Sequence, residues 1–307
     1  MDEKKILRVL PRGIRLILEC EKIDFSQLQE IKMRTEKPVI LTYRGKEIIL
    51  LNHYRKPYVI TQEEMKETLD YISNYSLYAY EEEMRQGFIT IEGGHRVGLA
   101  GQVILENGKV KNLKYISSVN IRISHEVIGC ADPVFFKVID NNQFLNTMII
   151  SPPGQGKTTL LRDMIRQLSD GNAYIKGMTV GVVDERSEIA GCYKGIPQNH
   201  LGLRTDILDC CPKEEGMLML VRTMAPKIIA VDEIGTESDI RAIEYAVHCG
   251  CRMVVTVHGD SLQDIQAKSA FARLIDNQVF KRFVVLNNQK RVGNIAAIFN
   301  EKGEMIG

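Results

Sequence analysis

Residues 151–159 read SPPGQGKTT, and this stretch decides the fold class of the chain. It follows the phosphate-binding pattern G-x-x-x-x-G-K-[ST] except at the first position, where Ser151 stands in place of glycine. A short apolar run, FLNTMII (144–150), precedes it, and a helical pattern, TTLLRDMIRQL, begins at its end. Loops that join a buried strand to a helix bind phosphate through backbone N–H groups and the helix dipole. The context therefore predicts a nucleotide-binding α/β domain.

The residue types of this loop fit separate roles in nucleotide binding. Gly154 and Gly156 are expected to adopt positive φ angles close to the phosphate oxygens. Lys157 would neutralise the β and γ phosphates, and the Thr158 hydroxyl would bind Mg²⁺, so ATP and Mg²⁺ are the expected cofactors. Ser151 lies where the loop leaves the strand, so its substitution should affect backbone conformation and not binding. The alternative is a Pro-Gly turn that only joins a strand to a helix. The predicted nucleotide-binding residues are Pro153, Gly154, Gln155, Gly156, Lys157, Thr158 and Thr159.

The sequence from Phe144 onward alternates β-branched apolar runs with helical stretches. Such runs indicate strands that are buried on both faces of a mostly parallel sheet. This half of the chain is therefore predicted to be an α/β domain. The expected strands after the loop are TVGVVD (179–184), KIIAVDE (227–233), RMVVTVH (252–258), RFVVL (282–286) and NIAAIF (294–299).

The N-terminal part of the chain has a different pattern and is predicted to be a smaller α+β domain. Helical patterns near 4–19 and 61–73 alternate with short strands, and Asn107-Gly108 predicts a type I′ hairpin turn. The expected strands are PVILTY (38–43), EIILL (47–51), GFITI (87–91) and QVILENGKV (102–110). The periodic pattern is interrupted at Ala131-Asp132-Pro133 and at Asn141-Asn142, which indicates the domain boundary. The predicted division is an N-terminal domain over 1–130, a linker over about 131–142 and an ATPase domain over 143–307.

The composition of the 307-residue chain excludes several classes of protein. Lys and Arg number 40 and Asp and Glu 39, so no charge excess suggests a nucleic-acid or membrane-surface specialist. No apolar run reaches the roughly 18 residues of a membrane helix, and the start, MDEKKILRVL, does not resemble a secretory signal. The seven cysteines include no C-x-x-C pair, which disfavours disulfides and zinc. These features favour a cytosolic protein with reduced thiols.

Two of the expected strands end in acidic residues. KIIAVDE ends in Asp232, which would hold the Mg²⁺ shell, and Glu233, which would polarise the attacking water. VVDERSE contains Asp184, Glu185 and Glu188, and one of these acids is also a candidate general base. Because parallel strands end at one edge of a sheet, both groups are expected to line one cleft. The alternative for each group is a set of solvated acids.

The remaining candidates are basic. Arg186 could neutralise phosphate charge or hold the acids apart, and His258 ends a strand where it could sense the γ-phosphate or couple subunits. A structural histidine is the alternative for His258. Arg204 and Arg222 are candidate arginine fingers, which reach phosphate from a neighbouring subunit, and Arg96 is a further candidate. Surface salt bridges are the alternative for these arginines.

The segments SPPGQGKTTLLRD, VVDERSEIAG, KIIAVDEIG and TVHG closely resemble the stage III sporulation protein AA family of endospore-forming bacteria. The resemblance extends over the chain, including LQEIKMRTEKPVI and GFITIEGGHRVGLAGQV. That family is similar in turn to type II and type IV secretion ATPases and pilus motors, which implies a RecA-like P-loop NTPase domain. The resemblance places Walker A on Gly154 to Thr159, the Asp box on Asp184 to Glu188, Walker B on Asp232-Glu233 and the His box on His258.

This sequence departs from the secretion ATPases at Walker B, where they usually carry Gly-Glu. Asp184, Glu185 and Glu233 therefore all stand as candidates for the general base. The resemblance implies a cytoplasmic homo-hexamer on the mother-cell side, peripherally docked on membrane proteins of a sporulation channel complex between mother cell and forespore. Its ATP hydrolysis would energise that complex.

Two other functions are compatible with the motifs. A RecA-type core also drives nucleic-acid-stimulated ATPases, and KNLKYISSVNIRIS (111–124) offers basic residues for phosphate contacts. The balanced net charge disfavours that alternative, so no nucleic-acid partner is expected. A nucleotide-gated scaffold that binds ATP with little turnover is the third hypothesis, and the full set of acids argues against it.

Overall fold

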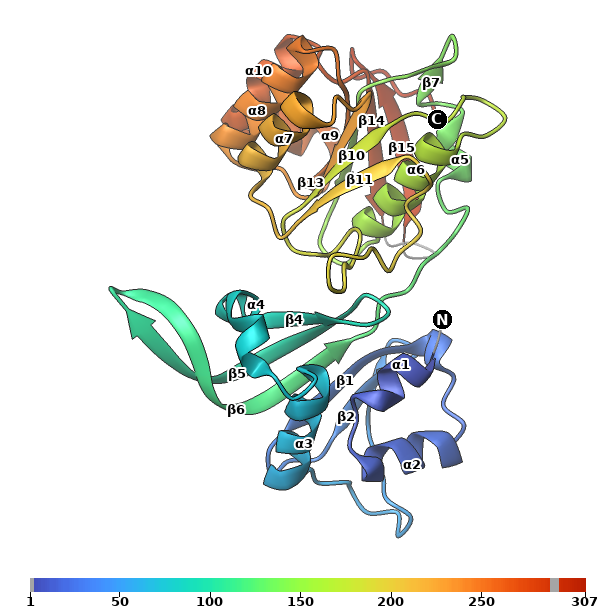
Figure 1. Cartoon of the computed structure of the whole chain (residues 1–307). Helices are drawn as coiled ribbons and strands as arrows, with labels where there is room; N and C mark the ends of the chain where they lie inside the picture. Colours follow the sequence, from blue (N-terminus) through green and yellow to red (C-terminus); the bar gives the residue numbers. More distant parts are fainter. Residues whose placement is uncertain (1–2, 288–292) are drawn as a thin grey trace. The chain divides into compact units, whose positions relative to one another are not determined.

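The structure, a computed structural model, describes residues 3–287 and 293–307 (Figure 1). The chain divides into two compact units between His125 and Glu126. Each unit has its own hydrophobic core, which lies against the sheet of that unit.

The expected linker, residues 131–142, belongs instead to the C-terminal unit. Phe135 is fully buried in the core of that unit, so the segment is part of the packed domain. Asn141 and Asn142 have positive φ angles, as a tight hairpin turn requires. The polar residues that suggested a linker therefore form a turn, and the boundary lies earlier than expected. The segment and the residues next to it form α5 (Asp132–Phe135), β7 (Ile139–Asp140) and β8 (Gln143–Phe144).

The N-terminal unit is an antiparallel sheet in the strand order β3-β2-β1-β6-β5-β4. Side chains alternate across the sheet: Ile31 and Met33 are buried in the core with helix residues, whereas Arg34 is exposed. The strands are β1 (Leu28–Arg34), β2 (Ile40–Tyr43), β3 (Lys46–Ile49), β4 (Phe88–Ile91), β5 (His95–Glu106) and β6 (Lys109–Arg122).

The helices of this unit begin and end at recognisable residues. The expected helix over 4–19 is divided at Pro11, which has an extended backbone and is the N-cap of the second helix. Thr61 and Glu64 form a capping box at the start of α3. The helices are α1 (Glu3–Arg8), α2 (Arg12–Cys20), α3 (Gln62–Ile72) and α4 (Glu81–Gln86), with short 3₁₀ segments η1 (Phe25–Gln27) and η2 (Leu77–Tyr80).

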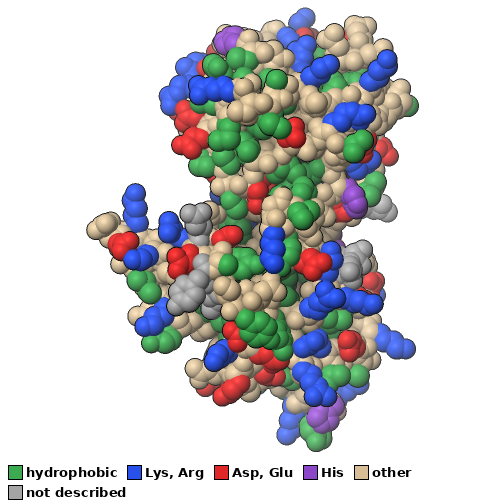
Figure 2. All heavy atoms as spheres, in the orientation of Figure 1, with side chains coloured by type: hydrophobic (Ala, Val, Ile, Leu, Met, Phe, Trp, Pro, Cys, Tyr) green, Lys and Arg blue, Asp and Glu red, His purple; other side chains and the backbone are tan. Residues whose placement is uncertain are grey.

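Strands β5 and β6 continue beyond their neighbours as a two-stranded arm (Figure 1). Asn107 and Gly108 have φ angles of 51° and 74° between the paired Glu106 and Lys109, which confirms the predicted type I′ turn. We call residues 102–115 the β-arm. Figure 2 shows hydrophobic and basic side chains next to one another over it.

The C-terminal unit contains a mostly parallel sheet in the order β11-β10-β12-β13-β9-β14-β15. All neighbouring pairs are parallel except β14 with the edge strand β15. The α/β prediction is therefore confirmed. The strands are β9 (Thr147–Ser151), β10 (Val180–Asp184), β11 (Thr205–Asp209), β12 (Ile228–Val231), β13 (Arg252–His258), β14 (Arg282–Asn287) and β15 (Asn294–Asn300).

Helices cover both faces of this sheet, which explains its continuous apolar runs. In β9, Ile149 packs in the core with α6, whereas Ile150 packs in the core with α7 and α8 on the opposite face. Within residues 3–287 and 293–307, no helix is long and apolar enough to cross a bilayer. The helices are α6 (Lys157–Asp170), α7 (Lys213–Thr223), α8 (Glu237–His248), α9 (Leu262–Gln266) and α10 (Ala272–Asp276), with the 3₁₀ segment η3 (Ser269–Phe271).

Strand β11 was not predicted from the sequence. It lies at the edge of the sheet and its five residues, TDILD, are all half-buried, so it has no apolar run. The central strands were predicted because both of their faces are buried. The strand order places β13 between β9 and β12, and the carboxyl ends of these parallel strands meet at one edge of the sheet.

Candidate nucleotide-binding site

The loop after β9 has an open backbone conformation. Gly154 and Gly156 have φ angles of 73° and 91°, as the sequence predicted. A Cβ atom added to Gly154 would meet no heavy atom within 4 Å, so the space beside this residue is free for a ligand. Ser151 is buried at the end of the strand, where its Oγ donates a hydrogen bond to the Pro152 carbonyl at 2.8 Å. The departure from the loop pattern therefore lies in the strand.

Helix α6 begins directly after this loop. Its N-cap is Gly156, and no side chain caps the helix. The first N–H groups of a helix have no partner within it, and they attract an anion through their charge and the helix dipole. Behind the loop, the Gln155 carbonyl accepts a hydrogen bond from the Gly293 N–H at 2.7 Å. This helix end fits a phosphate group.

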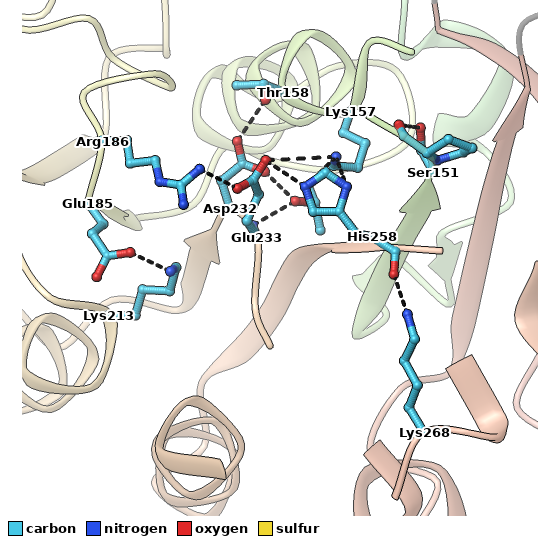
Figure 3. A network of polar contacts seen from close by, with 12 residues as sticks. Ser151, Lys157, Thr158, Glu185, Arg186, Lys213, Asp232, Glu233, His258 and Lys268 are labelled. Atoms are coloured by element: carbon cyan, nitrogen blue, oxygen red, sulfur yellow. Dashed lines mark hydrogen bonds and ion pairs between the residues drawn. The ribbon is translucent and has the colours of Figure 1, made fainter. Parts of the chain in front are cut away.

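Lys157 points into the site from the first position of α6 (Figure 3). Its side chain is only 5% exposed, and its Nζ lies 3.0 Å from His258 Nδ1 and 3.9 Å from Glu233 Oε1. Burial lowers the pKa of its ammonium group below the usual value, although nearby carboxylates oppose that effect. The loop therefore presents a buried cation beside the open backbone.

Thr158 and Asp232 form the pair expected to hold a metal ion. Thr158 Oγ1 donates a hydrogen bond to Asp232 Oδ2 at 2.7 Å. Thr256, on β13, donates a second hydrogen bond to Asp232 Oδ1. A hydroxyl and a carboxylate are hard oxygen ligands of the kind that Mg²⁺ binds, with water and phosphate as its other ligands. The residues present therefore fit Mg²⁺.

Glu233 stands at the centre of a polar network. Its Oε1 accepts a hydrogen bond from His258 Nε2 at 2.9 Å, and its Oε2 accepts one from Arg186 Nη1 at 2.8 Å. Partial burial raises the pKa of its carboxyl, but His258, Arg186 and Lys157 outweigh burial and bring the pKa below its usual value. Glu233 is therefore an ionised carboxylate next to the loop lysine.

The contacts of His258 are satisfied by one neutral tautomer. Nδ1 can accept from Lys157 Nζ, while Nε2–H donates to Glu233. Parallel pairing of β13 with β9 places His258 beside Ser151 at the edge of the sheet. The Nζ of Lys268 also binds the His258 carbonyl at 2.7 Å, which fixes the end of this strand.

Asp184 has a structural role instead of the predicted place in the cleft. It is buried, and its carboxylate accepts hydrogen bonds from the N–H groups of Glu188, Ile189 and Ala190 at 2.8, 2.9 and 2.8 Å. Burial raises its pKa to about 6 despite these hydrogen bonds. Asp184 shapes the loop after β10, and its oxygens are occupied by the backbone.

The other two Asp-box acids, Glu185 and Glu188, have different surroundings. Glu185 Oε2 lies 2.5 Å from Lys213 Nζ on α7, so its carboxylate is paired with that lysine and not with a site residue (Figure 3). The backbone carbonyl of Glu188 accepts a hydrogen bond from Arg162 Nη2 at 3.1 Å, and its carboxylate is among the charges that oppose the lowering of the Lys157 pKa. Among the three acids considered as the general base, Glu233 is the one beside the loop lysine.

The arginine candidates separate into two groups. Arg186 reaches the site and binds Glu233. Arg204 precedes β11, at the amino ends of the parallel strands, and its Nη1 donates to the Ser169 carbonyl at 3.0 Å. Arg222 is exposed in the last turn of α7, and Arg96, in the N-terminal unit, lies over the Phe88 ring at 3.7 Å. The structure brings only Arg186 of this set to the loop within the described chain.

Thr256 is a site residue that was not predicted from the sequence, and neither were Lys213 and Lys268, which contact Glu185 and His258. Thr256 binds Asp232 through its hydroxyl and also accepts the Glu233 N–H at 2.8 Å. Its signal in the sequence is a polar residue inside the apolar run RMVVTVH. The two lysines have no comparable signal because their partners lie on other elements.

The model of the family described as sporulation stage III, protein AA, matches residues 1–306. The chain belongs to this family. Stage III sporulation protein AA of Bacillus subtilis (strain 168) is 42% identical over 303 residues, which cover 98% of this chain and 96% of that protein. An uncharacterized protein, ycf45 of Cyanidium caldarium, is 30% identical over 162 residues, which cover 52% of this chain and 46% of that protein. The family resemblance predicted from the sequence is thus confirmed.

Solved structures of an ATPase and of a pilus motor share the fold. The ATPase DotB of Yersinia pseudotuberculosis matches with a TM-score of 0.63 at 15% identity, over 94% of this chain and 79% of that one. The pilus retraction motor PilT, solved with ADP, matches with a TM-score of 0.57 at 12% identity, over 88% of this chain and 77% of that one. This chain therefore shares the fold of an ATPase and of a pilus retraction motor, as expected.

Proposed function

We propose that this chain is a Mg²⁺-dependent ATPase of the secretion-motor type. The observation that carries the proposal is the convergence of four side chains beside an uncapped helix N-terminus. Phosphoryl transfer to water requires a cation for phosphate, oxygen ligands for a metal ion and a carboxylate for water. The four side chains that offer these groups are Lys157, Thr158, Asp232 and Glu233.

Each residue has a role that follows from its position. The loop backbone and Lys157 would bind the phosphates, while Thr158 and Asp232 would hold the metal ion. Bound Mg²⁺ would supply positive charge against the phosphate oxygens. Glu233 would orient a water molecule and accept its proton as the water oxygen attacks the γ-phosphorus and the bond to the bridging oxygen breaks.

The contacts of Glu233 also suggest why it becomes available as a base only after nucleotide binds. Arg186 and His258 occupy both oxygens of the carboxylate, and Lys157 lies 3.9 Å from one of them. A triphosphate carries more negative charge than one carboxylate, so it would attract Lys157 and the exposed Arg186. Glu233 would then be free to bind water.

The sporulation family and the secretion-ATPase fold support a proposal for the role in the cell. The chain acts as a cytoplasmic homo-hexamer on the mother-cell side and binds membrane proteins of a channel complex between mother cell and forespore. Its ATP turnover energises that complex. Arg204 and Arg222, which lie away from the loop, and Arg96 of the N-terminal unit are the candidates that would reach a neighbouring subunit.

Replacing Glu233 with glutamine tests the central assignment. The ATP hydrolysis rate should fall by about 10² to 10⁴ because the general base is lost. Binding of a fluorescent ATP analogue should stay near wild type, because the loop and Lys157 are unchanged. Glu185→Gln is the matched control, since Glu185 pairs with Lys213 and should leave the rate nearly intact.

Three results would contradict the proposal. A large loss in Glu185→Gln with none in Glu233→Gln would move the base to the Asp box. Nucleotide binding with no measurable turnover in the wild type would favour a gated scaffold. Strong stimulation by DNA or RNA at low salt would favour the nucleic-acid alternative.

A further inference from the structure

The β-arm carries an exposed apolar face. Its register places Val103 opposite Leu113 and Leu105 opposite Val110, so these side chains share one face of the ribbon. Leu113 packs against the core of the N-terminal unit. Val103, Leu105 and Val110 are 46%, 64% and 38% exposed. The apolar surface of the unit therefore continues outward along the arm, where it meets solvent.

For its length, the β-arm is also more basic than the chain as a whole. Three lysines and one glutamate, all exposed, give residues 102–115 a net charge of +2, whereas the whole chain has +1. Lys111 Nζ lies 2.6 Å from Glu106 Oε1, so these two charges neutralise each other. Lys109 and Lys114 carry the excess. An acidic or anionic surface would therefore complement the arm.

The side-chain types distinguish the possible partners. Surfaces for single-stranded nucleic acid use aromatic rings and arginine, and protein interface cores are rich in aromatic residues, methionine and arginine. The β-arm instead combines Val, Ile and Leu with Lys, and contains a single aromatic residue, Tyr115, 71% exposed. Lysines on its open edges disfavour pairing with another strand. Aliphatic side chains beside lysines are typical of elements that lie on anionic bilayers.

We propose that the β-arm binds the surface of a bilayer that contains anionic phospholipids. The aliphatic side chains of the exposed face enter the boundary between headgroups and acyl chains, and Tyr115 lies at headgroup level. Lys109 and Lys114 contact lipid phosphates, which their long flexible side chains can reach. This activity is independent of nucleotide and goes beyond the proposed ATPase.

Sedimentation of the full chain with vesicles tests this proposal. The wild type should sediment with vesicles of equal parts phosphatidylglycerol and phosphatidylcholine, and not with phosphatidylcholine alone. The triple variant Lys109→Gln, Lys111→Gln, Lys114→Gln also leaves Glu106 without its ion pair, so the net charge of the arm falls by three. It should lose affinity on the order of a hundredfold, about fivefold for each unit of charge. The double variant Val103→Ser, Leu105→Ser keeps every charge and should lose about tenfold.

A matched control distinguishes this site from general charge. The control triple variant replaces exposed lysines outside the arm in the same unit: Lys46→Gln, Lys56→Gln and Lys66→Gln. It should bind vesicles as the wild type does, and circular dichroism should show that all variants melt together. The proposal is overturned if the control loses as much as the arm triple, or if the wild type ignores anionic vesicles. The proposal would also be overturned if the chain bound labelled single-stranded DNA and not vesicles, and if that binding were lost in the triple lysine variant of the arm but kept in the variant Val103→Ser, Leu105→Ser.

Discussion

Glu233 adopts a backbone conformation that is unusual for its residue type. Its φ is 53°, in the left-handed region, where a non-glycine residue needs support from its surroundings. Thr256 gives that support, because its hydroxyl accepts the Glu233 N–H and donates to Asp232. A single threonine on β13 thus fixes both acids that follow β12. The strained glutamate is consistent with a functional position.

Arg186→Gln should raise the pKa of Glu233, because Arg186 is one of the cations that hold this pKa below its usual value. The acid limb of the kcat/KM profile, which reports the enzyme before nucleotide binds, should therefore move to higher pH. Arg186→Lys keeps the charge and should leave the limb near that of the wild type. Steady-state ATPase rates measured across the acidic pH range give the position of this limb. If the limb of Arg186→Gln lies at the wild-type pH, Arg186 does not lower the pKa of Glu233.

The same pKa shift affects folding stability. The folded-state pKa of Glu233 is lowered, so ionised Glu233 stabilises the fold above its unfolded-state pKa. That contribution is lost as the pH falls from the ordinary glutamate range through the folded-state pKa.

At the scale of elements, the loop between β9 and α6 can be compared with an ordinary turn. Gly154 and Gly45 have nearly equal φ angles, 73° and 74°, and an added Cβ would meet nothing within 4 Å at either position. Alanine should therefore cost each site a similar amount of stability, about 1 kcal/mol. Only Gly154→Ala should weaken ATP binding, because its Cβ enters the space beside the loop backbone. Nucleotide titration and thermal unfolding measure the two effects, and equal ATP affinities would argue against phosphate at Gly154.

Two adjacent phenylalanines test where the C-terminal unit begins. Phe135 is fully buried in the core, whereas Phe136 is 48% exposed. Phe135→Ala should lower the unfolding free energy by about 3–5 kcal/mol, and Phe136→Ala by less than about 1 kcal/mol. Urea denaturation gives both values. Small effects at both positions would restore the interpretation of this segment as a linker.

The whole molecule consists of two units with separate cores, so each should fold by itself. A fragment over 126–307 should unfold cooperatively on heating. A fragment over 143–307 lacks α5 and the buried Phe135, so it should melt at a lower temperature or fail to fold. Calorimetry of the two fragments decides between these boundaries, and equal melting temperatures would favour the later one.

The sequence by itself determined the α/β fold, the phosphate-binding loop and the positions where strands end. These features are local: strands buried on both faces produce continuous apolar runs, and the loop pattern lies within nine residues. The resemblance to a sporulation family followed from the same segments. Parallel topology then made it possible to expect Lys157, Asp232 and His258 at one edge.

Only the tertiary structure decided what each polar side chain contacts at that edge. In the structure, Asp184 accepts backbone hydrogen bonds, Glu185 pairs with Lys213, and Glu233 lies beside Lys157. These contacts join segments that are far apart in the chain. Because the same Asp-Glu pair stands at the carboxyl end of both strands, the local sequence does not indicate which acid contacts which partner. The edge strand β11 was missed because its residues are only half-buried and leave little apolar pattern. Segment 131–142 was missed because its polar turn suggested a linker, although Phe135 is buried in the core.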